Sequence, residues 1–218
     1  MRNTNSDRSL SWADKLIVQI DQGLRTLSPG ASTAERPSPS KAIGETELSQ
    51  LDKKHAASLM RINHTGEVCA QALYQGQAMT AKLPNIRQAM QTAAREEIDH
   101  LAWCEDRLQE LDSQTSYLNP LWYAMSFGLG AIAGLAGDRW SLGFVAETEK
   151  QVCDHLQDHL TKLPEPDEKS KAILAQMLID EKKHGDSARS AGGSELPLPL
   201  KKAMGLVSEV MKKTAYRI

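Results

Sequence analysis

The sequence contains two copies of one arrangement, in which a lone glutamate is followed about 30 residues later by a Glu-x-x-His pair. The residues concerned are Glu67 with Glu97 and His100, and Glu149 with Glu181 and His184. On a helix, such a pair places a carboxylate and an imidazole about one turn apart on one face. Four antiparallel helices presenting Glu, Glu-x-x-His, Glu and Glu-x-x-His to their interior bind two metal ions. Any single one of these residues is also typical of a solvated helix face, so the prediction of a metal centre depends on all six together.

The spacing within each copy fits two helices of about 20 residues joined by a short loop. Apolar residues recur at helical spacing through both copies, and Pro84 and Pro164 mark breaks between helices. The sequence therefore predicts an all-α, ferritin-like four-helix bundle with a long apolar crossover between its second and third helices. Additional helices are expected before and after it. The expected bundle helices cover residues 46–82, 85–111, 139–163 and 167–188, and the additional helices cover 11–27 and 198–217.

Residues beside the six candidate ligands suggest how the ligands are supported. Asp180 directly precedes Glu181, a position from which an aspartate can orient a metal-bound imidazole through its free N–H. His64 lies one turn before Glu67, and we interpret it as a residue behind the ligands or a buried structural histidine.

Three further residues are candidates for a substrate cavity. Gly66 weakens a helix interior by about 1 kcal/mol relative to alanine, so it indicates close approach, either of a ligand or of another helix. Cys153 and Leu156 follow Glu149 by four and seven residues and share its face, so we expect both to line the cavity.

Other acidic and histidine residues near the motifs are not expected to be ligands. Glu96 points about 100° away from Glu97 around the helix. His155 and His159 have the spacing of a metal-binding pair but lie on a different face from Glu149. We interpret these two histidines as surface residues or as residues behind the ligands.

Residues 113–137 contain no Asp, Glu, Lys or Arg. The segment is too short and too rich in glycine to predict a bilayer span, which needs about 20 apolar residues. It could be a crossover buried against the bundle. We favour a helix or hairpin that contacts lipid, with Trp122, Tyr123 and Trp140 at the level of the headgroups.

The chain divides by composition into an N-terminal segment, 1–44, and a bundle domain, 45–218. The N-terminal segment combines an amphipathic helix, marked by Trp12, Leu16, Ile17, Ile20 and Leu24, with a Pro/Ser-rich linker at 28–41 that is not expected to bury a core. Its first residues lack the apolar core of a secretion signal.

Charge and cysteine content exclude some classes of protein. The net charge of −2 and the lack of a dense basic block argue against a nucleic-acid partner. The three cysteines, Cys69, Cys104 and Cys153, show no C-x-x-C spacing and indicate reduced thiols of an intracellular protein.

The motifs Arg61-Ile-Asn-His-Thr-Gly-Glu67, Glu97-Ile-Asp-His100, Glu149 and Asp180-Glu-Lys-Lys-His184 resemble those of the demethoxyubiquinone hydroxylases of ubiquinone biosynthesis. The resemblance covers about residues 45–218. It implies a ferritin-like bundle, two iron ions held by the six residues above, and O2-dependent hydroxylation of a polyprenylated benzoquinol. It also implies peripheral attachment to the cytoplasmic face of the inner membrane. Some relatives carry a tyrosine where Leu156 stands here, which argues against a mechanism that needs a phenol beside the iron.

Electrons would come from the quinol itself or from NADH, acting directly or through the quinone, and the sequence has no Gly-x-Gly-x-x-Gly motif for binding a dinucleotide. A homo-oligomer or a complex of biosynthetic enzymes is a further possible assembly.

The alternative function is a ferritin-like iron oxidase or iron-handling protein with the same ligands and no quinol chemistry. A tRNA hydroxylase and a metal-free scaffold are more distant alternatives.

Overall fold

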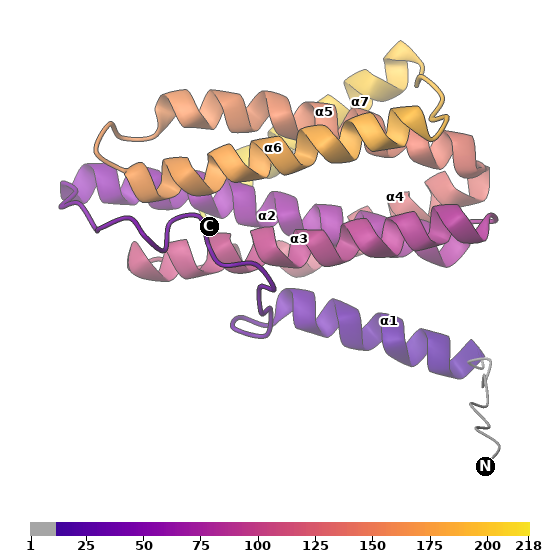
Figure 1. The fold of residues 1–218 in the computed structure, drawn as a ribbon, viewed down its shortest axis with the longest axis horizontal. Helices are drawn as coiled ribbons and strands as arrows, with labels where there is room; N and C mark the ends of the chain where they lie inside the picture. The colour runs from indigo at the N-terminus through magenta and orange to yellow at the C-terminus, as the bar shows by residue number, and fades with distance from the viewer. Residues whose placement is uncertain (1–11) are drawn as a thin grey trace.

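A computed structural model describes residues 12–218, and this part of the chain contains seven helices and no strand (Figure 1). The helices are α1 Trp12–Leu27, α2 Gln50–Thr80, α3 Pro84–Glu110, α4 Asn119–Ala136, α5 Asp138–Lys162, α6 Glu168–Ser190 and α7 Leu198–Ala215. The predicted all-α class is confirmed. Residues 1–11 of the predicted N-terminal segment lie outside the described residues, as do the side chains of Trp12 and Leu16.

Helices α2, α3, α5 and α6 form the bundle, with α2 packed on α3 and α5 packed on α6 (Figure 1). Local signals set their first residues. The Ser49 hydroxyl accepts a hydrogen bond from the Asp52 N–H at the start of α2, and the Asp167 carboxylate does the same for Ser170 at the start of α6. Pro84 occupies the first turn of α3, where the missing N–H costs nothing.

The core between the four helices is closely packed. Its largest fully buried side chains include Trp103, Met60, Leu156, Ile173 and Met177, which come from all four helices. The apolar faces of the helices thus meet in the interior, as their sequence periodicity predicts.

Helix α4 lies in the uncharged segment 113–137, connects α3 to α5, and packs along α2. Glycines let the two backbones approach each other. A Cβ atom added to Gly130 would lie 2.2 Å from the Leu73 carbonyl oxygen, and one added to Gly76 would lie 2.3 Å from the carbonyl oxygen of Phe127. Trp122 is buried against the core, so the expectation that it lies at the level of lipid headgroups is wrong.

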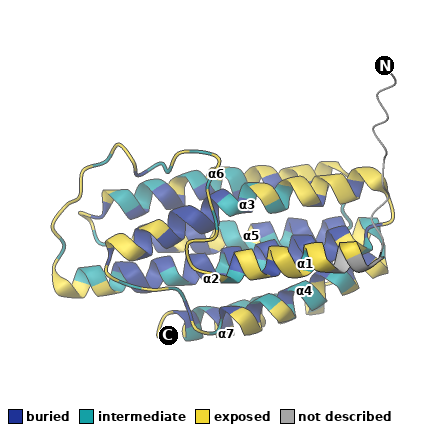
Figure 2. Ribbon diagram, turned by 90° about the horizontal axis from the view of Figure 1, so that it is seen from below, coloured by how far each residue is buried: buried dark blue, intermediate teal, exposed yellow. Residues whose placement is uncertain are grey.

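The outer face of α4 remains exposed and apolar, with Leu121, Ile132 and Leu135 each more than 60% exposed. Helix α1 packs on α2 and α4 and also points apolar residues outward (Figure 2). No helix in residues 12–218 has the length and apolar character that crossing a bilayer requires.

Residues 28–49, which we call the strap, join α1 to α2 without forming a helix. The strap nevertheless lies against the bundle. Ala34 packs on the core, Ser40 is buried, and the N–H of Gly30 donates to Glu105 of α3 at 2.6 Å. At the end of the strap, Glu45 pairs with the buried guanidinium of Arg107. Acidic and basic side chains of α3 therefore bind the strap in addition to its few apolar contacts with the core, which include Ala34.

Candidate metal centre

The six candidate ligands meet inside the bundle. Each bundle helix contributes: Glu67 comes from α2, Glu97 and His100 from α3, Glu149 from α5, and Glu181 and His184 from α6. All six side chains are buried, none more than 8% exposed. Ligand atoms of Glu67, Glu97, His100 and Glu181 lie within 4.8 Å of one another, close enough to share a metal ion.

His184 and Glu149 adjoin this group. The Nδ1 atom of His184 lies 3.1 Å from Glu97 Oε1 and 3.3 Å from Glu181 Oε2. The Nδ1 atom of His100 lies 3.0 Å from Glu181 Oε1 and 3.1 Å from Glu97 Oε2. Glu97 and Glu181 therefore lie between the two imidazoles, and both imidazoles present Nδ1 to the carboxylates.

The other ring nitrogens are held by carboxylates from the opposite helix. His100 on α3 is placed to donate from Nε2 to Asp180 on α6, at 3.0 Å. His184 on α6 is placed to donate from Nε2 to Glu96 on α3, at 2.5 Å. Such partners fix the tautomer and the orientation of a metal-binding imidazole. The acidic residue before each Glu-x-x-His pair thus supports the histidine of the other pair.

Burial and repulsion between neighbouring carboxylates disfavour the ionised forms of Glu67 and Glu149. Burial raises the pKa of Glu67 well above its usual range, and the charges of Glu97 and Glu181 add to the effect. Burial followed by the same two charges raises the pKa of Glu149. Burial also opposes ionisation of Glu97, but hydrogen bonds from His100 and His184 outweigh it and lower the pKa of this carboxyl.

Each of the four candidate carboxylate ligands also has one oxygen atom without a hydrogen-bond partner. Glu67 Oε2, Glu97 Oε1, Glu149 Oε2 and Glu181 Oε1 are buried without a hydrogen-bond partner, although imidazole nitrogens approach three of them within 4 Å. A buried acceptor without a donor is costly. Four carboxylates carry a charge that two divalent cations would neutralise, so this donor set fits a pair of metal ions.

Tyr74 is a site residue that the sequence analysis missed. Its hydroxyl donates a short hydrogen bond to Glu149 Oε1 in the interior. Burial, followed by the charge of Glu149, raises the pKa of this phenol well above its usual range, so it remains a donor. The expectation that Leu156 argues against a phenol at the centre is therefore wrong, because the phenol comes from α2. The sequence feature that could have identified Tyr74 is its position seven residues, or two helical turns, after Glu67, which places both side chains on one face of the helix.

An apolar cavity of about 230 Å³ lies between α2, α4, α5 and α7. Gly66, one residue before Glu67, lines it, and a Cβ added there would meet no atom within 4 Å. Cys153 and Leu156 are not among its lining residues. Leu156 is fully buried in the core and Cys153 is partly exposed, because the face of α5 toward the cavity carries Thr148, Val152 and His155 instead.

The remaining histidines of interest lie in the interior. His64 is buried with Nδ1 3.4 Å from the Asn119 amide, and burial lowers its pKa to about 4. His155 and His159 are also buried, so their interpretation as surface residues is wrong. His159 pairs with Asn63 at 2.9 Å, and burial lowers the pKa of His155 to about 3 and that of His159 to about 4.

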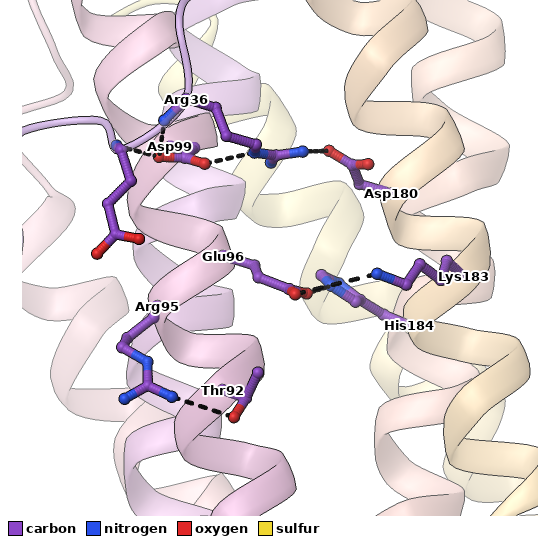
Figure 3. Close-up of a pocket in the computed structure, with 9 residues that line it drawn as sticks. Arg36, Thr92, Arg95, Glu96, Asp99, Asp180, Lys183 and His184 are labelled. Carbon is purple, nitrogen blue, oxygen red and sulfur yellow. Dashed lines mark hydrogen bonds and ion pairs between the residues drawn. The ribbon is translucent and has the colours of Figure 1, made fainter.

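A polar pocket of about 370 Å³ lies on the other side of the centre, between α3 and α6 (Figure 3). Glu96 of α3 and His184 of α6 meet in its wall, and the strap residue Arg36 extends from α3 toward Asp180. The candidate centre thus adjoins a polar pocket lined by His184 and lies one residue along α2 from the lining of an apolar cavity, at Gly66.

Comparison with known proteins agrees with this geometry. Residues 54–215 match the family model described as ubiquinone biosynthesis protein COQ7. The chain is 60% identical over 213 residues to the 3-demethoxyubiquinol 3-hydroxylase of Ectopseudomonas mendocina (strain ymp) and 61% identical over 213 residues to that of Stutzerimonas stutzeri (strain A1501). Each alignment covers 98% of this chain and 99% of the relative. The enzyme of the same name from Pseudomonas aeruginosa (strain LESB58) is 56% identical over 214 residues, which cover 98% of this chain and 100% of the relative. The chain therefore belongs to the COQ7 family of ubiquinone biosynthesis proteins.

Proposed function

We propose that this protein is a 3-demethoxyubiquinol 3-hydroxylase, an O2-dependent monooxygenase that hydroxylates the ring of a polyprenylated demethoxy-benzoquinol in ubiquinone biosynthesis. The observation that carries the proposal is a buried Glu/His centre beside an apolar cavity. The chain that holds both is 56–61% identical, over nearly its whole length, to relatives named for this reaction.

The metal is proposed to be a pair of iron ions held by Glu67, Glu97, His100, Glu149, Glu181 and His184. Their carboxylate and imidazole donors suit iron, and the unpartnered carboxylate oxygens supply places for it. When bound, the irons supply the redox chemistry that activates O2. The electrons are proposed to come from the quinol or from NADH.

The chain's own residues hold this centre in position. Tyr74 fixes one oxygen of Glu149 and leaves the other free. Asp180 and Glu96 hold the two imidazoles with Nδ1 turned inward. Trp103 packs next to the centre, with its ring 5.5 Å from the His100 ring, and Met177 is fully buried in the same core.

The apolar cavity is proposed to bind the substrate. Its walls include Trp122, Met125 and Met211, and few polar groups face it. Gly66 leaves room where the cavity comes nearest along α2 to Glu67. We place the quinol ring in the cavity near Gly66, next along α2 to Glu67, with the isoprenoid tail along the apolar wall.

The protein is further proposed to attach peripherally to the cytoplasmic face of the inner membrane. Leu129 of α4 both lines the cavity and is 39% exposed, so the cavity opens beside the apolar outer face of α4. Together with the exposed apolar residues of α1, this face would rest in the headgroup region and let a lipid-soluble tail enter from the side. Assembly as a homo-oligomer or within a biosynthetic complex is compatible with the same surface.

The function is tested by measuring iron content and quinol turnover on purified protein in detergent, with wild type beside Glu149→Ala. Glu147→Ala is the matched control, because Glu147 lies on the same helix and pairs with Lys201 away from the centre. We expect two irons and one hydroxylated product for wild type and control, and loss of product for Glu149→Ala. Rapid ferrous oxidation without any modified quinol would favour the iron-handling function, and no bound iron would contradict both.

A further inference from the structure

The strap is fixed to α3 at the level of the metal centre. The N–H of Glu35 donates to Asp99 Oδ1 at 2.6 Å, and the Trp103 indole donates to the carbonyl oxygen of Arg36 at 3.3 Å. Asp99 and Trp103 flank His100 in the sequence by one and three residues. The strap therefore crosses α3 at Asp99 (Figure 3), the residue directly before the candidate ligand His100.

The Arg36 side chain joins α3 to α6. Its Nε donates to Asp99 Oδ2 at 2.5 Å and its Nη1 to Asp180 Oδ2 at 2.9 Å, and its guanidinium lies 4.9 Å from the centre of the Trp103 ring. The same Asp180 oxygen accepts from His100 Nε2 at 3.0 Å. Arg36, Asp180 and His100 therefore form a continuous chain of charge-assisted hydrogen bonds from the strap to the centre.

The other imidazole is supported differently. His184 pairs with Glu96, whose side chain is 38% exposed at the rim of the polar pocket, with the exposed Lys183 4.0 Å away. Asp180, by comparison, is 14% exposed and also accepts from Gln176 at 3.0 Å. The carboxylate behind His100 is thus covered and fixed, whereas the carboxylate behind His184 faces solvent.

We propose that Arg36 is a positioning residue for His100, and that the strap thereby slows release of metal from the His100 side of the centre. An imidazole whose outer partner is fixed keeps its tautomer and its orientation toward the metal. Without Arg36, Asp180 loses one of its three donors and the only one of them that comes from the strap, while His100 and Gln176 remain. The inference rests on the proposed di-iron centre, but Arg36 and most of the strap lie outside the part matched by the family model, which begins at residue 54.

The test loads full-length protein anaerobically with two ferrous ions and follows their transfer to an excess of a coloured ferrous chelator. The variants are Arg36→Ala and Arg36→Lys. Arg95→Ala is the matched control, because Arg95 lines the same polar pocket and bonds to Thr92 on its own helix. We expect Arg36→Ala to release one iron per chain about tenfold faster, Arg36→Lys to restore part of the difference, and Arg95→Ala to match wild type.

Mössbauer spectra of the ferrous proteins separate positioning from general loosening of the fold. A positioning role changes the signal of one of the two irons in Arg36→Ala and leaves the other unchanged. Wild-type release rates in Arg36→Ala would overturn the inference, as would equal acceleration of both irons together with a lower melting temperature of the metal-free protein. Wild-type protein that binds no iron would instead contradict the proposed function, and the inference with it.

Discussion

At the scale of single residues, the carboxylate of Glu149 is held by one neutral donor, the hydroxyl of Tyr74. The other ligands exchange contacts with imidazoles, but Oε2 of Glu149 has no hydrogen-bond partner. Tyr74 therefore determines which oxygen of Glu149 faces the centre. Its ring is fully buried, so the hydroxyl has little freedom to move away.

Replacing Tyr74 with phenylalanine keeps the ring and removes this donor. We expect turnover of the quinol to fall by about 10- to 100-fold, because Glu149 is no longer held in one orientation. The KM for the quinol should stay close to wild type, since Tyr74 is not among the residues lining the apolar cavity.

Tyr123→Phe is the control for this prediction. It removes the same group, which donates to Gln75 outside the centre. Steady-state kinetics on both variants, with iron content measured in parallel, make the comparison. Wild-type turnover in Tyr74→Phe would show that the hydroxyl has no role in holding Glu149.

The six candidate ligands were recognisable from the sequence, because the two Glu-x-x-His pairs and the glutamates about 30 residues before them form a pattern within the chain. Glu96 and Tyr74 were not, because their partners lie on other helices. Glu96 points away from Glu97, as expected, and for that reason reaches His184 on α6. Which helix faces it depends on the packing of α3 against α6, and the spacing of residues within one helix does not contain that information.

At the scale of the elements, the contact between α2 and α4 shapes the apolar cavity, since both helices line it. Gly76 and Gly130 bring the backbones together. Small residues at a helix crossing allow closer approach than larger ones, and here the approach places Trp122 in the core.

Gly130→Ala tests this contact. The new Cβ would meet the Leu73 carbonyl at 2.2 Å, a backbone atom that cannot move aside without moving the helix. We expect a loss of unfolding free energy of about 1–3 kcal/mol. Urea unfolding followed by circular dichroism measures it.

Gly128→Ala, two residues earlier on α4, is the matched control, because a Cβ there would meet nothing within 4 Å. Alanine should raise the unfolding free energy at that position by up to about 1 kcal/mol, through helix propensity alone. Equal effects of the two substitutions would contradict a close contact at Gly130.

Helix positions followed approximately from the sequence because caps and breakers are local: α3 begins at Pro84, one residue before the expected start, whereas α2 begins at Gln50 and not at residue 46. The attachment of the strap to the bundle could not be predicted in this way. Its Pro/Ser-rich composition correctly indicates that it has no helix, but its attachment depends on Asp99, Glu105 and Arg107 of α3. These residues read as ordinary charges of a solvated face, since their partners lie more than 60 residues away in the chain.

At the scale of the whole molecule, the two ends of the site face different surroundings. The polar pocket opens between α3 and α6, and the apolar cavity opens beside α4. The exposed apolar residues of α1 and α4 lie on two helices that pack against each other. This arrangement suits a protein that takes a lipid-soluble substrate from a membrane surface.

The double variant Ile132→Glu/Leu135→Glu tests the membrane face. Both side chains are 65% exposed on α4, so the substitutions should leave the fold intact. We expect binding to vesicles of mixed zwitterionic and anionic lipids to fall by about tenfold or more, because each buried aliphatic side chain contributes about 1.5–3 kcal/mol.

Leu51→Glu provides the comparison, since Leu51 is 82% exposed at the start of α2, away from α4's outer residues in the sequence. Co-sedimentation with the vesicles gives the bound fraction. Equal loss of binding in both proteins, or none in either, would place the membrane contact elsewhere.

The central claim, that the Glu/His centre transfers oxygen from O2 to the quinol ring, is tested most directly by isotope labelling. Reduced, iron-loaded wild type and Glu181→Ala would be supplied with a demethoxy-quinol and isotopically labelled O2, and the product analysed by mass spectrometry. The account predicts one labelled oxygen atom in the wild-type product and no product from Glu181→Ala. A wild-type product whose new oxygen came from water, or label in the product of Glu181→Ala at the wild-type rate, would contradict it.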